Sequence, residues 1–257
     1  MTGKLRRVVT AEQLEPLLHA LWIEREGTSL RDEDRKKCVE VAALLNELSK
    51  INRSHPLVDV AAGKAYVGLL AAELLGFEDV TVIERDPRRI ADVEQAAKRL
   101  RRVKKLTLRE ADVGDVSAWP TERATVVGLH ACGPASDAII DVACAREVRW
   151  LLLVPCCYSA KLTQWNAAHA LADRLGVPEV AAVRSRFIEA MVDAERTLRL
   201  EARGFQTEVV PFVAPTVTPH NRLFRARRTA NPTSMQRAGD ALARLLSPHP
   251  TATSVKT

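Results

Sequence analysis

Hydrophobic residues recur with a helical period in the first part of the chain. Over residues 11–26, and again over residues 31–52, apolar side chains fall three or four positions apart with charged residues between them. This spacing places them on one face of a helix, so each stretch predicts an amphipathic helix. Thr10 is a suitable N-cap for the first helix. We predict that residues 1–53 form an N-terminal helical extension.

From residue 54 the pattern changes to short, continuous apolar runs with helical segments between most of them. The runs are PLVDV (56–60), VTVIERD (80–86), LTLREAD (106–112), ATVVGLHACG (124–133) and VRWLLLVPCCY (148–158). Strands that are apolar without alternation, with helices between them, are typical of a parallel sheet covered on both faces. We therefore predict one α/β domain over residues 54–246.

Two helical segments follow the fifth run, and two more strands come after them. These strands are FQTEVVPFV (205–213) and NRLFRARR (221–228). Pro211 has no N–H to donate, which favours an edge position for the first of the two. A final helix is predicted over residues 232–246. We expect the polar residues 247–257 to form a disordered tail.

Charge and cysteine content narrow the class of protein. The chain of 257 residues has a formal net charge of +6, which suits an anionic partner such as RNA. A solvated basic surface without a partner explains the charge equally well. Five irregularly spaced cysteines do not indicate a disulfide framework, so a reducing, cytoplasmic location is favoured. No apolar run has the length of a signal peptide or a membrane span, and we expect no membrane partner.

Acidic and small residues follow the predicted strands, where a doubly wound sheet binds its ligands. Asp59, Ala61 and Gly63 follow the first strand, Glu84 ends the second and Asp112 ends the third. Small residues let the backbone approach a ligand, while the two later carboxylates suit a ribose diol and an adenine amino group. Neither a G-x-G-x-x-G pattern nor a Walker loop is present. An acid before the loop suits the positive methionine end of S-adenosylmethionine (SAM), which we predict as the cofactor; a plain turn without a ligand is the alternative.

Three segments in this order resemble the class I SAM-dependent methyltransferase domain. They are VDVAAGKAYVG (58–68), LHACGPASD (129–137) and PCCYS (155–159). The family pattern is D-x-x-x-G-K-G, L-H-x-C-G-x-x-[ST]-D and C-C-Y-[HS], as in methyltransferase-like proteins, and is similar to that of tRNA 2′-O-methyltransferases acting on the acceptor stem. The resemblance spans Asp32 to Arg228. It implies a Rossmann-like sheet of seven strands with the last pair antiparallel, preceded by the helical extension.

The resemblance also implies roles for individual residues. Asp59, Gly63, Glu84 and Asp112 would hold SAM. The other two segments would line the methyl-transfer side, through His130, Cys132, Gly133, Asp137, Cys156, Cys157 and Tyr158.

Two departures from the family pattern affect how far those roles carry over. Ala65 replaces the third glycine of the loop, and Ser159 stands where some members carry histidine. Ala61 also stands where a glycine is usual. Alanine fits these positions if φ is negative, so the substitutions do not exclude cofactor binding.

Three accounts compete for the two adjacent thiols. In the first, His130 borders the cofactor and acts as general base, while Tyr158, Cys156 and Cys157 shape the acceptor pocket. In the second, His130 and the thiols, with Cys132, bind a metal such as zinc, although the usual C-x₂-C spacing is missing. In the third, the cysteines are buried packing residues. We favour the first account and expect no metal.

The predicted reaction is methyl transfer from SAM to an oxygen or nitrogen nucleophile. Charge and the resemblance favour RNA as the acceptor, bound through the basic surface. Two alternatives remain open at this point. One is a small-molecule methyltransferase of secondary metabolism, with the helical extension capping its pocket. The other is a SAM-binding interaction module without catalytic activity.

Overall fold

The computed structural model describes residues 8–24 and 27–247. The predicted tail therefore lies outside the described residues, except for Ser247. The N-terminal segment contains α1 (Ala11–Leu18), the π-helical turn η1 (His19–Ile23) and α2 (Asp32–Leu48). Thr10 caps α1 by accepting from the Gln13 N–H, as its sequence position predicts.

The remainder of the chain alternates strands and helices as far as β5. In chain order the elements are β1 (Leu57–Val60), α3 (Tyr66–Leu70), η3 (Ala71–Leu75), β2 (Asp79–Glu84), α4 (Pro87–Ala97), β3 (Lys105–Glu110), η4 (Val116–Ala118), β4 (Thr125–Ala131), α5 (Pro134–Ala145) and β5 (Trp150–Pro155). After them come α6 (Thr163–Arg174), α7 (Ala181–Ala202), β6 (Phe205–Pro211), β7 (Arg222–Arg228) and α8 (Pro232–Leu246).

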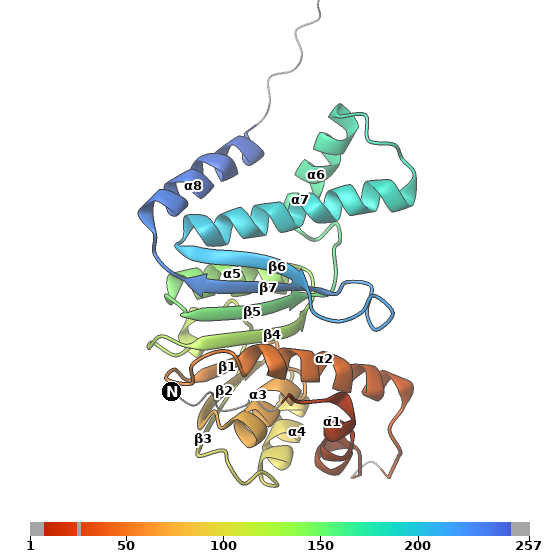
Figure 1. Cartoon of the computed structure of the whole chain (residues 1–257), viewed down its shortest axis with the longest axis vertical. Helices are drawn as coiled ribbons and strands as arrows, with labels where there is room; N and C mark the ends of the chain where they lie inside the picture. Colours follow the sequence, from red (N-terminus) through yellow and green to blue (C-terminus); the bar gives the residue numbers. More distant parts are fainter. Residues whose placement is uncertain (1–7, 25–26, 248–257) are drawn as a thin grey trace, which may run out of the picture.

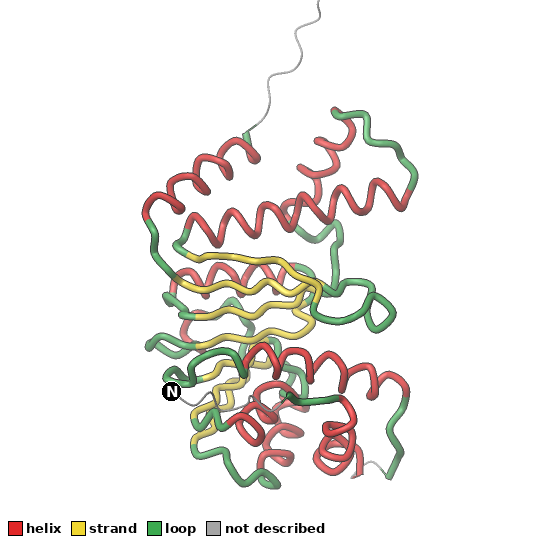
Figure 2. The backbone as a smooth tube through the Cα atoms, in the orientation of Figure 1, coloured by secondary structure: helices red, strands yellow, loops and turns green. Residues whose placement is uncertain are grey.

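The seven strands form one sheet in the order β3-β2-β1-β4-β5-β7-β6 (Figures 1 and 2). The first five strands are parallel, and β7 runs antiparallel to both β5 and β6. The strand order reverses between β1 and β4, which is the switch point where such sheets bind ligands. β6 lies at the edge, so Pro211 interrupts no inner ladder and its predicted position is confirmed.

Neighbouring residues along the strands point into two separate cores. Leu57 and Val80 pack with α1 to α4 on one face, whereas Val58 and Ile83 pack with α5 and Leu200 of α7 on the other. This alternation explains why the inner strands have no polar face. α6 and α8 pack on α7 beyond the β6 edge, at the top of Figure 1. The carboxyl ends of β1, β2, β4 and β5 thus open at one end of the sheet, where the predicted site residues lie.

Candidate functional site

The loop after β1 is held by a buried carboxylate. Asp59 is 2% exposed, and its Oδ2 accepts from the backbone N–H of Gly68 at 2.7 Å. A Cβ atom at residue 68 would lie 2.9 Å from the Asp59 Cβ. Glycine is therefore required at position 68 for the helix to approach the acid this closely.

Burial also changes the protonation of Asp59. Removal of the carboxylate from water, reinforced by the neighbouring charge of Glu84 and opposed by the Gly68 hydrogen bond, raises the pKa of Asp59 to about 7. Asp59 therefore changes its protonation state near neutral pH. A cationic group placed beside Asp59 would favour the ionised form, as a ligand ammonium would do.

Glu84 fixes the same loop from the end of β2. One carboxylate oxygen accepts from the Gly63 N–H at 2.7 Å, and the other accepts from the Asp86 N–H at 3.0 Å. Glu84 is 5% exposed as a whole residue, yet it lines a cavity. Asp112, after β3, is exposed and accepts from the Gly114 N–H at 2.9 Å.

The two alanines of the loop do not have the negative φ that suits alanine. Ala61 has φ +50° and Ala65 has φ +52°, as left-handed as Gly63 at φ +58°. The chain folds back on itself here, because the Ala65 N–H donates to the Ala62 carbonyl while Glu84 holds Gly63. The alanines therefore keep the backbone path that glycines would take, at a steric cost.

Two adjoining cavities receive these side chains. The larger, about 810 Å³, is lined by Glu84, Asp112, His130, Cys132 and Cys157 among others. The smaller, about 320 Å³, is lined by Asp59, Gly63 and Lys64 and includes Lys37 of α2. Ala61 and His130 border both cavities. The larger volume lies within the range of cofactor sites, and its acids lie at the carboxyl ends of the parallel strands β2 and β3, so the cavity fits an adenosyl ligand.

His130 stands at a break in β4. The β4–β5 register shifts between Leu129 and Ala131, and His130 has φ +62°, which is uncommon for a residue other than glycine. Such a bulge turns a side chain away from its normal direction in the ladder and is frequent beside active sites. Here it directs the imidazole toward α2, where Nε2 lies 2.7 Å from Oε2 of Glu40.

Glu40 is a site residue that the sequence reasoning missed. Burial disfavours its carboxylate, but hydrogen bonds from His130 and Lys37 outweigh that effect and lower the pKa of Glu40. Because a carboxylate only accepts, Nε2 of His130 must carry the proton, which leaves Nδ1 of a neutral ring as the acceptor. One signal was available in the sequence: Glu40 lies four residues before Leu44, on the apolar stripe of its helix.

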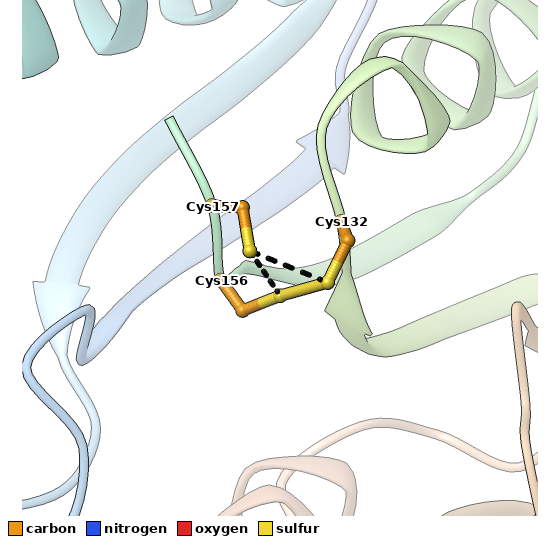
Figure 3. Close-up of side chains that lie close together, drawn as sticks. All are labelled: Cys132, Cys156 and Cys157. Carbon is orange, nitrogen blue, oxygen red and sulfur yellow. Dashed lines mark hydrogen bonds between the residues drawn. A yellow bond between two sulfur atoms is a disulfide. The ribbon is translucent and has the colours of Figure 1, made fainter. Parts of the chain in front are cut away.

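Three cysteine sulfurs from two strand ends meet in Figure 3, and the Cys156 sulfur lies 3.6 Å from the backbone carbonyl oxygen of His130. Cys132 follows β4 and is joined to Cys156 by a disulfide. The Cys157 sulfur lies 3.5 Å from that of Cys132 and 3.4 Å from that of Cys156. Cys38 and Cys144 lie elsewhere, buried and half-buried, as packing residues would be. The cysteines thus include one bonded pair, which their spacing did not predict.

The structure gives Tyr158 and Asp137 partners outside both cavities. The Tyr158 hydroxyl donates to Asp193 at 2.6 Å, and burial together with that carboxylate raises the pKa of the tyrosine. Asp137 pairs with Arg196 and Arg199 of α7. These contacts tie α5 and the β5 end to α7, and a catalytic role for Tyr158 stays a prediction.

Sheet order, an antiparallel seventh strand and acids at the carboxyl ends of β1 and β2 together define a class I SAM-dependent methyltransferase. A family described as "Methyltransferase domain" matches residues 35–164, about half of the chain, and the chain belongs to this family. SAM is its cofactor. Nothing among the curated proteins is a significant match to the chain. Within the described residues, no helix has the length and apolar character needed to cross a bilayer.

Several solved structures are similar in fold. Magnesium protoporphyrin IX methyltransferase from Synechocystis PCC 6803, with bound SAH, is 14% identical with a TM-score of 0.48, over 85% of this chain and 98% of that one. A putative caffeoyl-CoA O-methyltransferase from Staphylococcus aureus is 12% identical with a TM-score of 0.47, over 85% and 92%. TrmK of M. capricolum, in complex with SAH, is 7% identical with a TM-score of 0.45, over 72% and 67%.

Proposed function

We propose that the protein transfers the methyl group of SAM to an oxygen or nitrogen nucleophile on RNA, with His130 as general base. The cofactor supplies an electrophilic methyl carbon on its sulfonium. Glu84 and Asp112 would hold the adenosyl part in the larger cavity, and Asp59 would complement the positive methionine end. A cytoplasmic location is part of the same proposal, because five irregularly spaced cysteines do not form a disulfide framework even with one bonded pair, Cys132–Cys156.

The His130–Glu40 pair supports the assignment of the base. Glu40 fixes the tautomer and the orientation of the imidazole, as a third group does in other nucleophile–base arrangements. Nδ1 is then free to take the proton that the acceptor loses as its bond to the methyl carbon forms. Cys132 and Cys157 line the same cavity, in agreement with an acceptor site at this end.

The main support for RNA as the acceptor is a group of cationic residues at the larger cavity, which we call the cationic rim. Arg85, Arg89 and Lys161 line this cavity and are exposed. Arg85 follows β2, Arg89 lies in the first turn of α4, and Lys161 lies between β5 and α6, so one strand of phosphates passing the opening would meet positive charge from separate segments of the chain. The overall charge of +6 adds long-range attraction for the same polyanion.

The position of α2 favours a second candidate, a small acceptor. Lys37 borders the smaller cavity and Glu40 reaches His130, so α2 of the N-terminal extension covers one side of the site. A small nucleophile would fit beneath such a cover without any need for the rim.

An assay with labelled SAM distinguishes an RNA acceptor from a small acceptor. The full chain is incubated with labelled SAM and either total RNA or a metabolite extract. We expect label in RNA, and a loss of roughly 10²- to 10⁴-fold in turnover for His130→Ala with SAM affinity unchanged. Label in metabolites alone would favour the small acceptor, whereas SAM binding without any transfer would indicate an inactive module.

The rim is tested by charge reversal. Arg85→Glu or Lys161→Glu should weaken RNA binding and reduce the salt slope of log K by about 0.7 for each phosphate that the variant no longer neutralises. Arg244→Glu in the last turn of α8 is the matched control. It changes the net charge by the same amount, at a residue that does not line the cavity. Equal effects of all three variants would contradict an RNA site at this rim.

A further inference from the structure

The three sulfurs of Cys132, Cys156 and Cys157 have no explanation in the chemistry proposed so far. A pair of cysteines suffices for a disulfide, and methyl transfer from SAM needs no thiol. All three sulfurs nevertheless lie within 4.8 Å of one another. We call this group the thiol cluster.

The separations in the thiol cluster suit a metal ion. Four ligands at the Zn–S distance of about 2.3 Å around a tetrahedral ion lie roughly 3.8 Å apart. Cys157 already lies 3.4 and 3.5 Å from its two neighbours. The Cα atoms of Cys132 and Cys156 are 5.4 Å apart. Once their bond is reduced, side-chain rotation separates these two sulfurs and leaves three thiolates on one face of a tetrahedron.

The usual spacing rule misses such a site, because it describes ligands from one continuous segment. Here one ligand follows β4 and two follow β5, and the parallel pairing of these strands brings them together. The expectation of no metal came from sequence spacing, which does not report the distances across two strand ends.

The fourth position of this tetrahedron is open. Among the described residues, no further histidine, cysteine or acid joins the group, and Nε2 of the nearby His130 is engaged by Glu40. Cys132 and Cys157 face the larger cavity that also receives Glu84 and Asp112. Three protein ligands with an open fourth position distinguish catalytic zinc sites from structural ones.

We propose that the reduced thiol cluster binds a zinc-class divalent ion whose fourth position takes the methyl acceptor. The acceptor half of this statement rests on the function proposed above, whereas metal binding does not. A dithiol reductant supplies two electrons and two protons to the Cys132–Cys156 bond and itself becomes a disulfide. The three thiols then release their protons to solvent as the ion binds. Coordination lowers the pKa of the bound acceptor, whose proton passes to His130 or to water.

The test uses the full chain, reduced and stripped of metal, with Zn²⁺ and Co²⁺ as probes. We expect one Zn²⁺ per chain by elemental analysis, and sulfur-to-cobalt charge-transfer absorption with Co²⁺. Cys157→Ser is the decisive variant, because it leaves the Cys132–Cys156 pair intact. It should lower metal affinity by more than about tenfold, since loss of even an outer-shell partner typically costs that much.

Cys144→Ser is the matched control, a cysteine outside the thiol cluster, and should bind metal as the parent does. Oxidation with a disulfide-forming reagent should abolish binding, because it removes two thiolates. The proposal is overturned if the reduced chain takes up no Zn²⁺, or if Cys157→Ser binds it as tightly as the parent. Calorimetry with SAM on the metal-free chain reports separately on the cofactor site. RNA methylation by metal-free protein at the full rate would overturn only the acceptor half and leave the proposed function standing.

Discussion

Asp59→Asn isolates the effect of a titrating carboxyl group inside the core. The asparagine has the same shape, and its side-chain oxygen can still accept from the Gly68 N–H. It has no charge to bury. Folding raises the pKa of Asp59 from 3.8 to about 7, so the folded state binds a proton that the unfolded state releases. The stability this proton provides is fully present below pH 3.8 and is lost as pH rises through about 7.

The size of the effect follows from that shift. At about 1.4 kcal/mol per pKa unit, the raised pKa of Asp59 costs the folded state roughly 4 kcal/mol above pH 8 and roughly 1.5 kcal/mol at pH 5, relative to an aspartate with an unshifted pKa. The parent should therefore lose about 2–3 kcal/mol between these two pH values through this group alone. Asp59→Asn should avoid that loss, so its stability relative to the parent should rise by the same amount.

Urea unfolding at pH 5 and pH 8 measures this difference. Buried Trp22 and Trp119 provide a fluorescence signal. Asp240→Asn on α8, an exposed aspartate, is the control and should show no such pH dependence. If the stability of Asp59→Asn relative to the parent is the same at both pH values, Asp59 is not a titrating buried group. In SAM calorimetry at pH 8 the variant should bind roughly ten- to a hundredfold more weakly, as expected for a lost charged partner.

Four further substitutions test the loop and the base. Gly68→Ala places a Cβ 2.9 Å from the Asp59 Cβ and should cost about 1–3 kcal/mol in urea unfolding; an unchanged midpoint would contradict the close approach. Ala61→Gly relieves φ +50° and should stabilise the protein by roughly 0.5–1 kcal/mol after the entropic cost of glycine; a loss of stability would show that the alanine is not strained. Glu84→Gln leaves one of the two backbone N–H groups facing the side-chain NH₂, which cannot accept a hydrogen bond. It should lower the free energy of unfolding by about 1–3 kcal/mol and weaken SAM binding; urea unfolding and calorimetry on the same preparation measure the two effects. Glu40→Gln should lower turnover roughly 10- to 100-fold while SAM affinity stays as in the parent; a change in SAM affinity alone would place Glu40 in structure rather than in orientation of the base.

The sequence predicted the sheet well because burial on both faces leaves a clear pattern. Each of the apolar runs became a strand, and the position of Pro211 predicted the edge. The same reasoning found the acids at the strand ends, since parallel strands bring their carboxyl ends together. The local backbone conformation of the loop was harder to predict from the sequence. The positive φ of Ala61 depends on Glu84 holding Gly63 from another strand, and no local pattern reports such a contact.

Contacts between distant segments account for the remaining differences. Periodicity assigns Glu40 to a helix face but does not tell which strand end that face meets. The thiol cluster likewise depends on the pairing of β4 with β5. In both cases the residue types were visible in the sequence, and only the fold could bring them together.

The N-terminal extension is more closely joined to the site than a boundary near residue 53 indicates. α2 buries Leu44, Leu45 and Leu48 in the same core as α3, and its Glu40 supplies the partner of the His130 imidazole. The family match begins at residue 35, inside this helix. Because α2 both completes the core and holds the His130 imidazole through Glu40, it cannot move without changing this contact. With His130 as the base proposed above, an acceptor that displaces α2 would also release His130 from Glu40, so acceptor entry would change the readiness of that base to take a proton.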